Sequence, residues 1–354
     1  MVCLPDVQTE FDFNKRYPSW LKLVQLQVIH RHGPRTPLSY HLSHLYPFSW
    51  KLCSTEGPSY RGVKVVISGD EKQLNDTIIP TDGIPGNCLL GQLTDHGKAV
   101  MTKLGSFLKS TYFDGLGFQV AAHEIHLRST NLPRTIQSLS SLLIGLFPRN
   151  ESSISADKLP VLIRDEYLED MYGSIECQKY HSILAQHAER FARENAASIS
   201  NLHKSIPSIF HAPNLYGQKP SMYEIFDILF SRREHNLPLP KEVDNKIMDQ
   251  LEQLTTNEFF TLFNESKEAT RLAVGRFLRE IDANLYRKDR KLCIYSAHDS
   301  TIAPLLGAFS VAMGPKSPPF AAYCTLELFE TVDTASVVFR VSQAIYSSKL
   351  PRRV

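Results

Sequence analysis

The residues best suited to chemistry form one short segment near the start of the chain, Arg31-His32-Gly33-Pro34-Arg35-Thr36-Pro37. The forked guanidinium group of arginine matches phosphate oxygens with two parallel hydrogen bonds, and an imidazole can attack phosphorus without first losing a proton. A glycine beside them lets the backbone approach a ligand closely. The segment therefore predicts a phosphate site built around His32 as a nucleophile.

Two other segments place ionisable side chains directly after strand-like runs. The apolar run Leu292–Ala297 is followed by His298 and Asp299, and the run Ala122–Leu127 is followed by Arg128. Open α/β sheets bind their ligands at the carboxyl ends of the strands, so we expect these residues to meet the first segment there. Taken alone, the first segment also fits a solvated surface patch, in which His and Arg beside a turn are only local hydrogen-bond partners.

Alternation of side chains between two faces predicts the strand that would position His32, over Leu21–Ile29. Further short strands are expected at Val63–Ile67, Tyr323–Phe329 and Ala335–Val341. A helix is predicted to begin after the capping residue Thr94, with Val100, Leu104 and Leu108 on one face. The alternation of strands and helices indicates an α/β fold.

The length of 354 residues exceeds that of a typical single-core domain. Residues from about 150 to 290 are rich in charge, and Leu272, Phe277 and Ile281 belong to an apolar stripe at helical spacing. We therefore expect an α/β catalytic core formed by residues 20–149 and 291–346. Residues 150–290 would be an inserted, mainly helical cap domain.

The composition excludes some partners. Hydrophobic residues make up 42% of the chain, charged residues make up 21%, and 39 basic against 37 acidic residues leave a formal net charge of +2. This balance gives no support to nucleic-acid binding, and no stretch approaches the length of a membrane span. The six cysteines show neither a Cys-x-x-Cys pair nor zinc-like spacing with histidine, so we expect mostly reduced, buried thiols.

The order and spacing of these segments resemble the histidine acid phosphatases, branch 2 of the histidine phosphatase superfamily. The signature of that family is Arg-His-Gly-x-Arg-x-Pro early in the chain and His-Asp late, and both are present here. Residues 91–94, Arg128-Ser129-Thr130 and Arg134 add further matches. The resemblance implies a phosphoglycerate-mutase-like core, in which helices flank a central mixed, mostly parallel sheet.

The resemblance also implies an acid phosphatase, a phosphoric monoester hydrolase that needs no metal ion or other cofactor. His32 would be the nucleophile that forms a phosphohistidine, and Asp299 would be the proton donor to the leaving group. The phosphoryl oxygens would be bound by Arg31, Arg35, Arg128 and His298. Because Asp299 must carry a proton when the ester oxygen departs, activity should favour acidic pH.

Within this family the chain is similar to lysophosphatidic acid phosphatases, through Arg128-Ser129-Thr130-Asn131 and the run Leu142–Phe147. The expected partner is a small-molecule phosphomonoester, with a lysophospholipid as one candidate. The aromatic-rich region Tyr40–Trp50 suits an acyl chain and equally suits packing against the core. Two other functions stay open, a mutase-like phosphoryl transferase and a catalytically silent protein that binds phosphoinositides or phospholipids.

The first residues lack the features of a signal peptide, so we expect a cytoplasmic location, with mitochondria as the alternative that the narrower similarity suggests. The glycosylation acceptor patterns at Asn75, Asn150 and Asn264 would then be coincidental. An apolar helix stripe serves a dimer interface or an internal core equally well, so monomer and homodimer both stay open.

Overall fold

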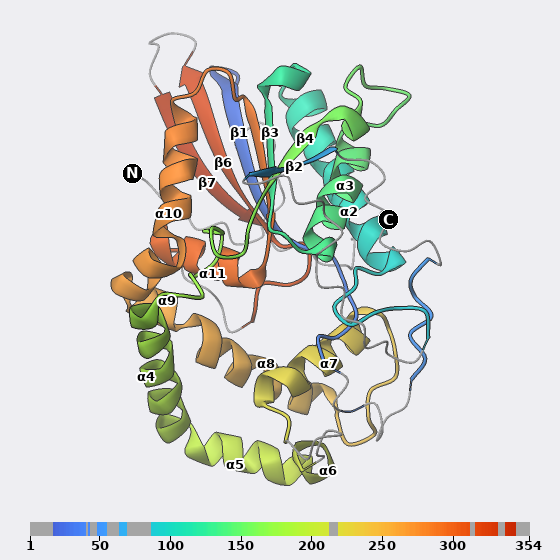
Figure 1. The fold of residues 1–354 in the computed structure, drawn as a ribbon, viewed down its shortest axis with the longest axis vertical. Helices are drawn as coiled ribbons and strands as arrows, with labels where there is room; N and C mark the ends of the chain where they lie inside the picture. Colours follow the sequence, from blue (N-terminus) through green and yellow to red (C-terminus); the bar gives the residue numbers. More distant parts are fainter. Residues whose placement is uncertain are drawn as a thin grey trace.

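The computed structural model describes residues 17–39, 42, 48–54, 64–68, 86–211, 219–311, 316–331 and 337–344. At its centre is a seven-stranded sheet with the order β2-β4-β3-β5-β1-β6-β7 (Figure 1). The strands are β1 (Leu21–Arg31), β2 (Lys64–Ser68), β3 (Ile125–Ser129), β4 (Pro160–Arg164), β5 (Leu292–Ala297), β6 (Tyr323–Thr331) and β7 (Val337–Ala344). The pairs from β2 to β1 are parallel, and β6 is antiparallel to β1 and β7. The predicted mixed, mostly parallel sheet is confirmed.

Helices cover both faces of the sheet and extend beyond one end of it. They are α2 (Asp95–Leu108), α3 (Pro133–Leu146), α4 (Gln178–Glu194), α5 (Ala196–Ser205), α6 (Pro207–Phe210), α7 (Met222–Glu234), α8 (Asn245–Phe260), α9 (Leu262–Glu265), α10 (Lys267–Leu285) and α11 (Asp299–Ala308). Short helical turns of other types span Lys109–Gly115, Ala122–Glu124 and Ala156–Lys158. Figure 1 shows α2 and α3 on one side of the sheet and α10 and α11 on the other.

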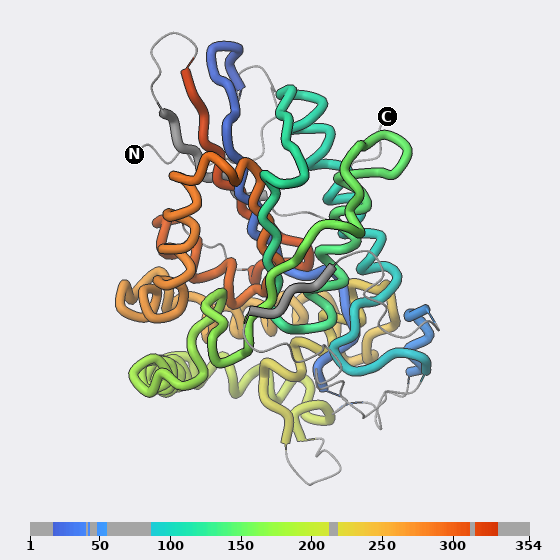
Figure 2. Tube along the Cα trace, turned by 45° about the horizontal axis from the view of Figure 1, so that its top comes forward, coloured from blue at the N-terminus to red at the C-terminus, as the bar shows by residue number. Residues whose placement is uncertain are grey.

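The apolar side chains of β1 alternate between two cores because successive strand residues point to opposite faces. Val28 packs with α2 and α3, whereas Ile29 packs with α10 and α11. A third core, which includes Phe191, Leu229 and Leu251, holds α4, α5, α7 and α8 together. In Figures 1 and 2 these four helices lie beyond the end of the sheet where β5 leads into α11. The fold thus has a layered α/β part and a helical part at the carboxyl ends of the strands.

One segment of the predicted helical insertion, residues 150–290, is a strand. β4 pairs in parallel with β3 and with β2, and its Val161 and Ile163 are fully buried. The strand has only five residues inside a charge-rich stretch, which is too short for its alternation to stand out. At the other end of the insertion, α10 packs against the sheet through Phe277 and Tyr295, whose ring centroids are 5.0 Å apart. Both ends of residues 150–290 therefore contribute to the α/β layers, and the division into core and cap stays a prediction.

The expectation of reduced cysteines needs correction. Cys53 and Cys88 form a disulfide with a Cα–Cα distance of 5.3 Å, whereas Cys177, Cys293 and Cys324 are free thiols. The pair is separated by 35 residues, and no local motif marks it in the sequence. Of the aromatic region Tyr40–Trp50, Phe48 and Trp50 pack beside this disulfide, and Tyr40 and Tyr46 lie outside the described residues. Cys3 also lies outside them.

No helix among the described residues is long and apolar enough to cross a membrane.

Candidate active site

The sheet brings the early and the late segment together. β1 and β5 are parallel neighbours, with Arg31 paired to Ala297, so the residues that follow each strand emerge side by side. The His32 backbone N–H donates to the Ala297 carbonyl at 3.0 Å, and the His32 and His298 ring centroids are 5.6 Å apart. The predicted meeting of His32 with His298 at the strand ends is therefore observed.

The hydrogen bonds of His32 fix which ring nitrogen is free. Its Nδ1 lies 3.0 Å from the carbonyl oxygen of Gly33, which can only accept, so Nδ1 carries the proton and Nε2 does not. Burial lowers the pKa of His32 well below its usual value, and the charges of Arg134, Arg35 and Arg31 lower it further. His32 is therefore a neutral imidazole with a bare Nε2.

The turn after His32 requires glycine at position 33. A Cβ there would lie 2.7 Å from the carbonyl oxygen of Gly97 and 2.9 Å from Met101 Cγ, both on α2. The Gly33 N–H donates to Ser138 Oγ on α3 at 3.0 Å. The turn is thus clamped between α2 and α3, and this packing fixes the direction of the His32 ring.

Arg31 and Arg35 are buried, and each is paired with a carboxylate. Arg31 Nη2 lies 2.8 Å from Asp299 Oδ2, and Arg35 Nη2 lies 2.7 Å from Asp227 Oδ1 on α7. Both guanidinium groups lie over the ring of Phe320, at 4.4 and 5.6 Å from its centroid. These contacts preorganise two cations beside His32, one against α11 and the other against the helical part.

Asp299, the predicted proton donor, is the first residue of α11. Burial raises the pKa of its carboxyl group, but the charges of Arg31 and Arg35 outweigh this effect, so that the pKa is lowered overall. Without a ligand, Asp299 is therefore ionised. A phosphate group that took over the hydrogen bond of Arg31 would remove the main stabilisation of this carboxylate and favour its protonation.

His298 is held by two threonines. Its Nε2 lies 3.0 Å from Thr130 Oγ1, which lies 2.9 Å from Thr135 Oγ1. The Thr135 hydroxyl has carbonyl acceptors at 2.8 and 3.0 Å, so Thr130 donates to Thr135 and accepts from the Nε2–H of His298. Burial and the charge of Arg134 lower the pKa of His298 to about 3, which keeps the ring neutral without a ligand.

The assignment of Arg128 as a phosphate ligand needs correction. Arg128 is fully buried on β3, with Nη2 at 2.6 Å from Glu169 and 2.5 Å from Asp170, and with Nη1 bonded to Glu280. Arg164 joins the same ion network through Asp170 and Glu280. Three carboxylates thus occupy the guanidinium group, which ties β3 to α10 and to the loop after β4.

Arg134, at the start of α3, occupies the place near His32 and His298 that was predicted for Arg128. It is the charged group with the largest effect on the pKa of both His32 and His298. Burial and the nearby charge of Arg35 lower the pKa of Arg134 to about 10. Among the described residues no carboxylate forms an ion pair with it, so its guanidinium group is available to an anion. Gly91, beside Arg134, has φ +66°, a backbone conformation that favours glycine.

The contrast between the two arginines can be tested directly. Arg134→Ala should raise KM for a phosphomonoester about ten- to a hundredfold, the value of one charge-assisted hydrogen bond, with little change in Tm. Arg128→Ala should instead lower the free energy of unfolding by about 3–5 kcal/mol, because it leaves buried carboxylates unpaired. Steady-state kinetics and thermal unfolding of both variants separate the two roles. If Arg128→Ala does not fold, Arg128→Lys should fold with a near-normal KM. A raised KM in a stable Arg128 variant would restore its predicted role.

The helical part also contributes residues that the sequence did not reveal. Asp227 pairs with Arg35, and Tyr223 lies one turn earlier on α7. Burial and the charges of Asp299 and Asp227 raise the pKa of Tyr223 to about 12, so its hydroxyl stays protonated. Tyr172, in the loop after β4, has its ring centroid 6.0 Å from that of His298. Nothing local in the sequence marks these residues, because their partners are distant along the chain.

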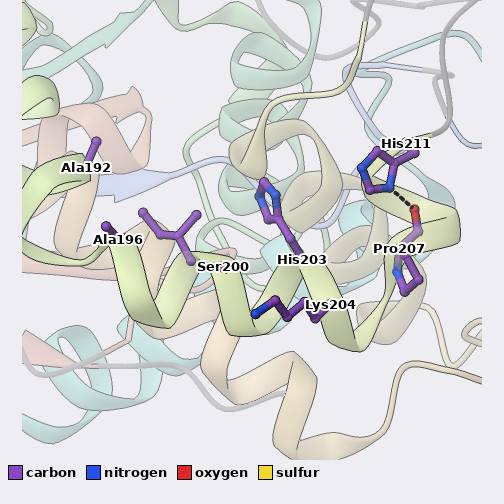
Figure 3. A pocket seen from close by; sticks show the side chains of 8 residues that line it. Ala192, Ala196, Ser200, His203, Lys204, Pro207 and His211 are labelled. Carbon is purple, nitrogen blue, oxygen red and sulfur yellow. Dashed lines mark hydrogen bonds between the residues drawn. The ribbon is translucent and has the colours of Figure 1, made fainter.

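A separate hollow lies away from this chemistry, on the helical part. It has a volume of about 490 Å³ and is lined mainly by α4, α5 and α6 (Figure 3). Among its labelled side chains, His211 accompanies Pro207, with a hydrogen bond between Nδ1 and the carbonyl at 2.9 Å. His32, His298 and the arginines beside them do not line it. In the described part of the chain, no group of three or more His, Cys, Asp or Glu side chains is arranged to hold a metal ion.

Comparison with known proteins links this geometry to one family. Residues 22–343 match the model of the histidine phosphatase superfamily, branch 2. A probable acid phosphatase of Schizosaccharomyces pombe is 25% identical, covering 90% of this chain and 75% of the relative. The human lysophosphatidic acid phosphatase type 6 is 26% identical, with 89% and 76% covered. Human testicular acid phosphatase is 28% identical, with 85% and 66% covered.

Solved structures show the same fold at lower identity. The phytase of Hafnia alvei in complex with myo-inositol hexakis sulphate has a TM-score of 0.64 at 14% identity, over 92% of this chain and 85% of the phytase. The multiple inositol polyphosphate phosphatase of Bifidobacterium longum has a TM-score of 0.55 at 12% identity, over 96% and 90%. The predicted architecture, a sheet flanked by helices with an additional helical part, is shared with these proteins.

Proposed function

The chain belongs to branch 2 of the histidine phosphatase superfamily, and we propose on that basis that it hydrolyses phosphomonoesters with His32 as the nucleophile. The observation that supports this most strongly is the state of His32. Its proton is held on Nδ1 by the Gly33 carbonyl, so the bare Nε2 is available amid Arg31, Arg35 and Arg134. Relatives named acid phosphatases, similar over most of their length, support the same enzyme class.

In the first step, His32 Nε2 would attack the phosphorus atom while the bond from phosphorus to the ester oxygen breaks. Arg31, Arg35 and Arg134 would bind the three phosphoryl oxygens and stabilise the charge that develops on them. Asp299 would give its proton to the departing oxygen. The products of this step are an alcohol and a phosphohistidine, with Asp299 ionised.

In the second step, water would attack phosphorus as the bond to Nε2 breaks. Asp299 would now accept a proton from that water, which regenerates the acid and releases inorganic phosphate. His298 would lie beside the phosphoryl group, next to His32, with its Nε2 held by Thr130.

For the substrate, we propose a phosphomonoester with an apolar alcohol, such as a lysophospholipid. Two large apolar side chains beside the site are exposed: Leu38, at 41%, and Phe259, at 42%. The Leu38 N–H is bonded to Asp227 Oδ2 at 2.7 Å, and the Phe259 ring is 5.0 Å from that of Tyr223, so both adjoin the arginine pocket. The human relative is named for lysophosphatidic acid, which agrees with such a surface.

The proposal is tested by phosphate release from matched esters in the presence of EDTA. We expect turnover that is faster at about pH 5 than at about pH 7.5. Lysophosphatidate should exceed glycerol 3-phosphate in kcat/KM by at least about tenfold, since burial of a few methylene groups supplies that factor. Leu38→Ser should remove this preference and leave p-nitrophenyl phosphate hydrolysis intact. Transfer of the phosphoryl group to a product without phosphate release would indicate the mutase-like function instead.

The cytoplasmic location stays a prediction, and the Cys53–Cys88 disulfide weighs against it. Disulfides persist in oxidising compartments and are rare in the reducing cytoplasm. Asn150 and Asn264, two of the three glycosylation acceptor residues, are exposed, whereas Asn75 lies outside the described residues. The monomer or homodimer expected from the sequence is likewise kept as a prediction.

A further inference from the structure

Asp227, on α7, forms two separate hydrogen bonds with the segment that follows β1. Asp227 is 5% exposed, and both of its oxygens are used: Oδ1 accepts from Arg35 Nη2 at 2.7 Å, and Oδ2 accepts from the Leu38 N–H at 2.7 Å. One carboxylate therefore orients the guanidinium group of Arg35 and holds the segment that follows the motif. This carboxylate also lies against a cation that must bind an anionic substrate.

The charges around His32 leave little room for a dianion. With neutral histidines, Arg31, Arg35 and Arg134 face the carboxylates of Asp227 and Asp299, which leaves one positive charge in excess. A phosphomonoester brings close to two negative charges at neutral pH. Binding therefore leaves about one uncompensated negative charge in a buried site, which is costly. The complex becomes neutral if it takes up one proton.

Asp299 is the carboxylate that can take this proton. Its Oδ2 is held by Arg31, whose hydrogen bond a phosphate oxygen would take over, and its side chain is 19% exposed. Asp227 cannot accept the proton without displacing either Arg35 or the Leu38 N–H. Resting on the proposed function, we infer that Asp227 is a positioning residue that couples binding of the phosphate dianion to protonation of Asp299, and so supplies the acid needed by the leaving group.

Other charged or titratable groups face this cluster from each neighbouring element. They are His32 after β1, Arg134 on α3, His298 before α11, and Tyr223 and Glu234 on α7. Glu234 lies two turns beyond Asp227 and acts on Arg31 through its charge, without an ion pair among the described residues. Burial raises the pKa of Glu234. Glu234 is therefore a suitable control, because it is a nearby charge that forms no ion pair with Arg31.

The experiment measures binding of inorganic sulfate, whose own charge does not change across the working range, from about pH 5 to about pH 7.5. In the wild type we expect the affinity to fall about tenfold per pH unit, because binding takes up one proton. Asp227→Asn keeps the shape and an acceptor oxygen but removes the charge. It should bind sulfate at least about tenfold more tightly at about pH 7.5, with a much flatter pH dependence.

Three readouts distinguish the proposed coupling from a purely structural role of Asp227 and from the proposed function. Asp249→Asn, an exposed change of the same charge on α8, should behave as the wild type, and Glu234→Gln should change the slope far less than Asp227→Asn. In Asp227→Asn, the ratio of kcat for an alkyl phosphate to kcat for p-nitrophenyl phosphate should fall below that of the wild type. An unchanged sulfate slope in a folded Asp227→Asn variant would overturn the coupling, even with phosphatase activity intact. Proton-linked sulfate binding without any turnover would overturn the proposed function and leave the coupling standing.

Discussion

Replacing His32 with alanine is expected to reduce phosphate release from every ester by about a thousandfold or more. The loss should be this large because the bare Nε2 of His32 lies among the three arginines, whereas the ring of His298 is held by Thr130. Sulfate binding should survive, since the arginines remain. The measurement is the initial rate with p-nitrophenyl phosphate and with an alkyl phosphate, beside the sulfate affinity of the same preparation.

Two further observations sharpen this result. His123→Ala, at an exposed position before β3, should keep full activity and so control for the substitution itself. In the wild type, a phosphoryl group should be found on His32 by mass spectrometry after an alkaline quench, because the N–P bond is cleaved in acid. Substantial turnover by His32→Ala, or a phosphoryl group on another residue, would refute the assignment of the nucleophile.

The parts of the site that lie at strand ends were predictable from the sequence. β1 and β5 are apolar runs that end directly before His32 and His298, and parallel neighbours in a sheet bring their carboxyl ends together. The fold class was also predictable, because strands and helices alternate along the chain. β4 was missed because five residues in a charged stretch give too little periodicity, although its pairing with β3 is unambiguous in three dimensions.

The choice between Arg128 and Arg134 was beyond the sequence. Both lie near the end of β3, and both match the family pattern, but only the fold shows that Glu169, Asp170 and Glu280 surround Arg128. Asp227 was missed for a related reason, because 192 residues separate it from Arg35. Local patterns identify which side chains can bind phosphate, whereas the positions of opposing charges decide which of them are free to do so.

The ion network of Arg128 supports the site indirectly, because it fixes the loop that lies beside His298. Arg128 holds the loop after β4 through Glu169, whose Oε1 also accepts from the backbone N–H groups of Asp170 and Met171. Tyr172, the next residue, lies beside His298. The network thus fixes the segment beside His298, while Asp227 on α7 fixes Arg35. In both places, buried charges are paired with opposite charges of the protein itself.

Asp299→Asn is expected to distinguish esters by their leaving groups. An alkoxide needs a proton as it departs, so kcat for an alkyl phosphate should fall by about a hundred- to ten-thousandfold, the range of general acid catalysis. The p-nitrophenolate ion is stable without that proton, so its release should change little. Asparagine keeps an oxygen that can accept from Arg31, which preserves the contact seen at 2.8 Å. Steady-state and pre-steady-state rates with both esters provide the measurement.

The pH dependence of the same variant gives an independent check. In the free protein the pKa of Asp299 is lowered, with Arg31 the main opposing charge, so the carboxylate prevails without substrate. In the wild type, kcat/KM for an alkyl phosphate should therefore fall as the pH rises, because the free enzyme must take up the proton that the leaving group needs. Asparagine does not titrate, so this decline should flatten in Asp299→Asn, whereas the exposed control Asp282→Asn should keep it. Equal losses on both esters would mean that Asp299 acts only by holding Arg31, and the proton would then have to come from the substrate itself.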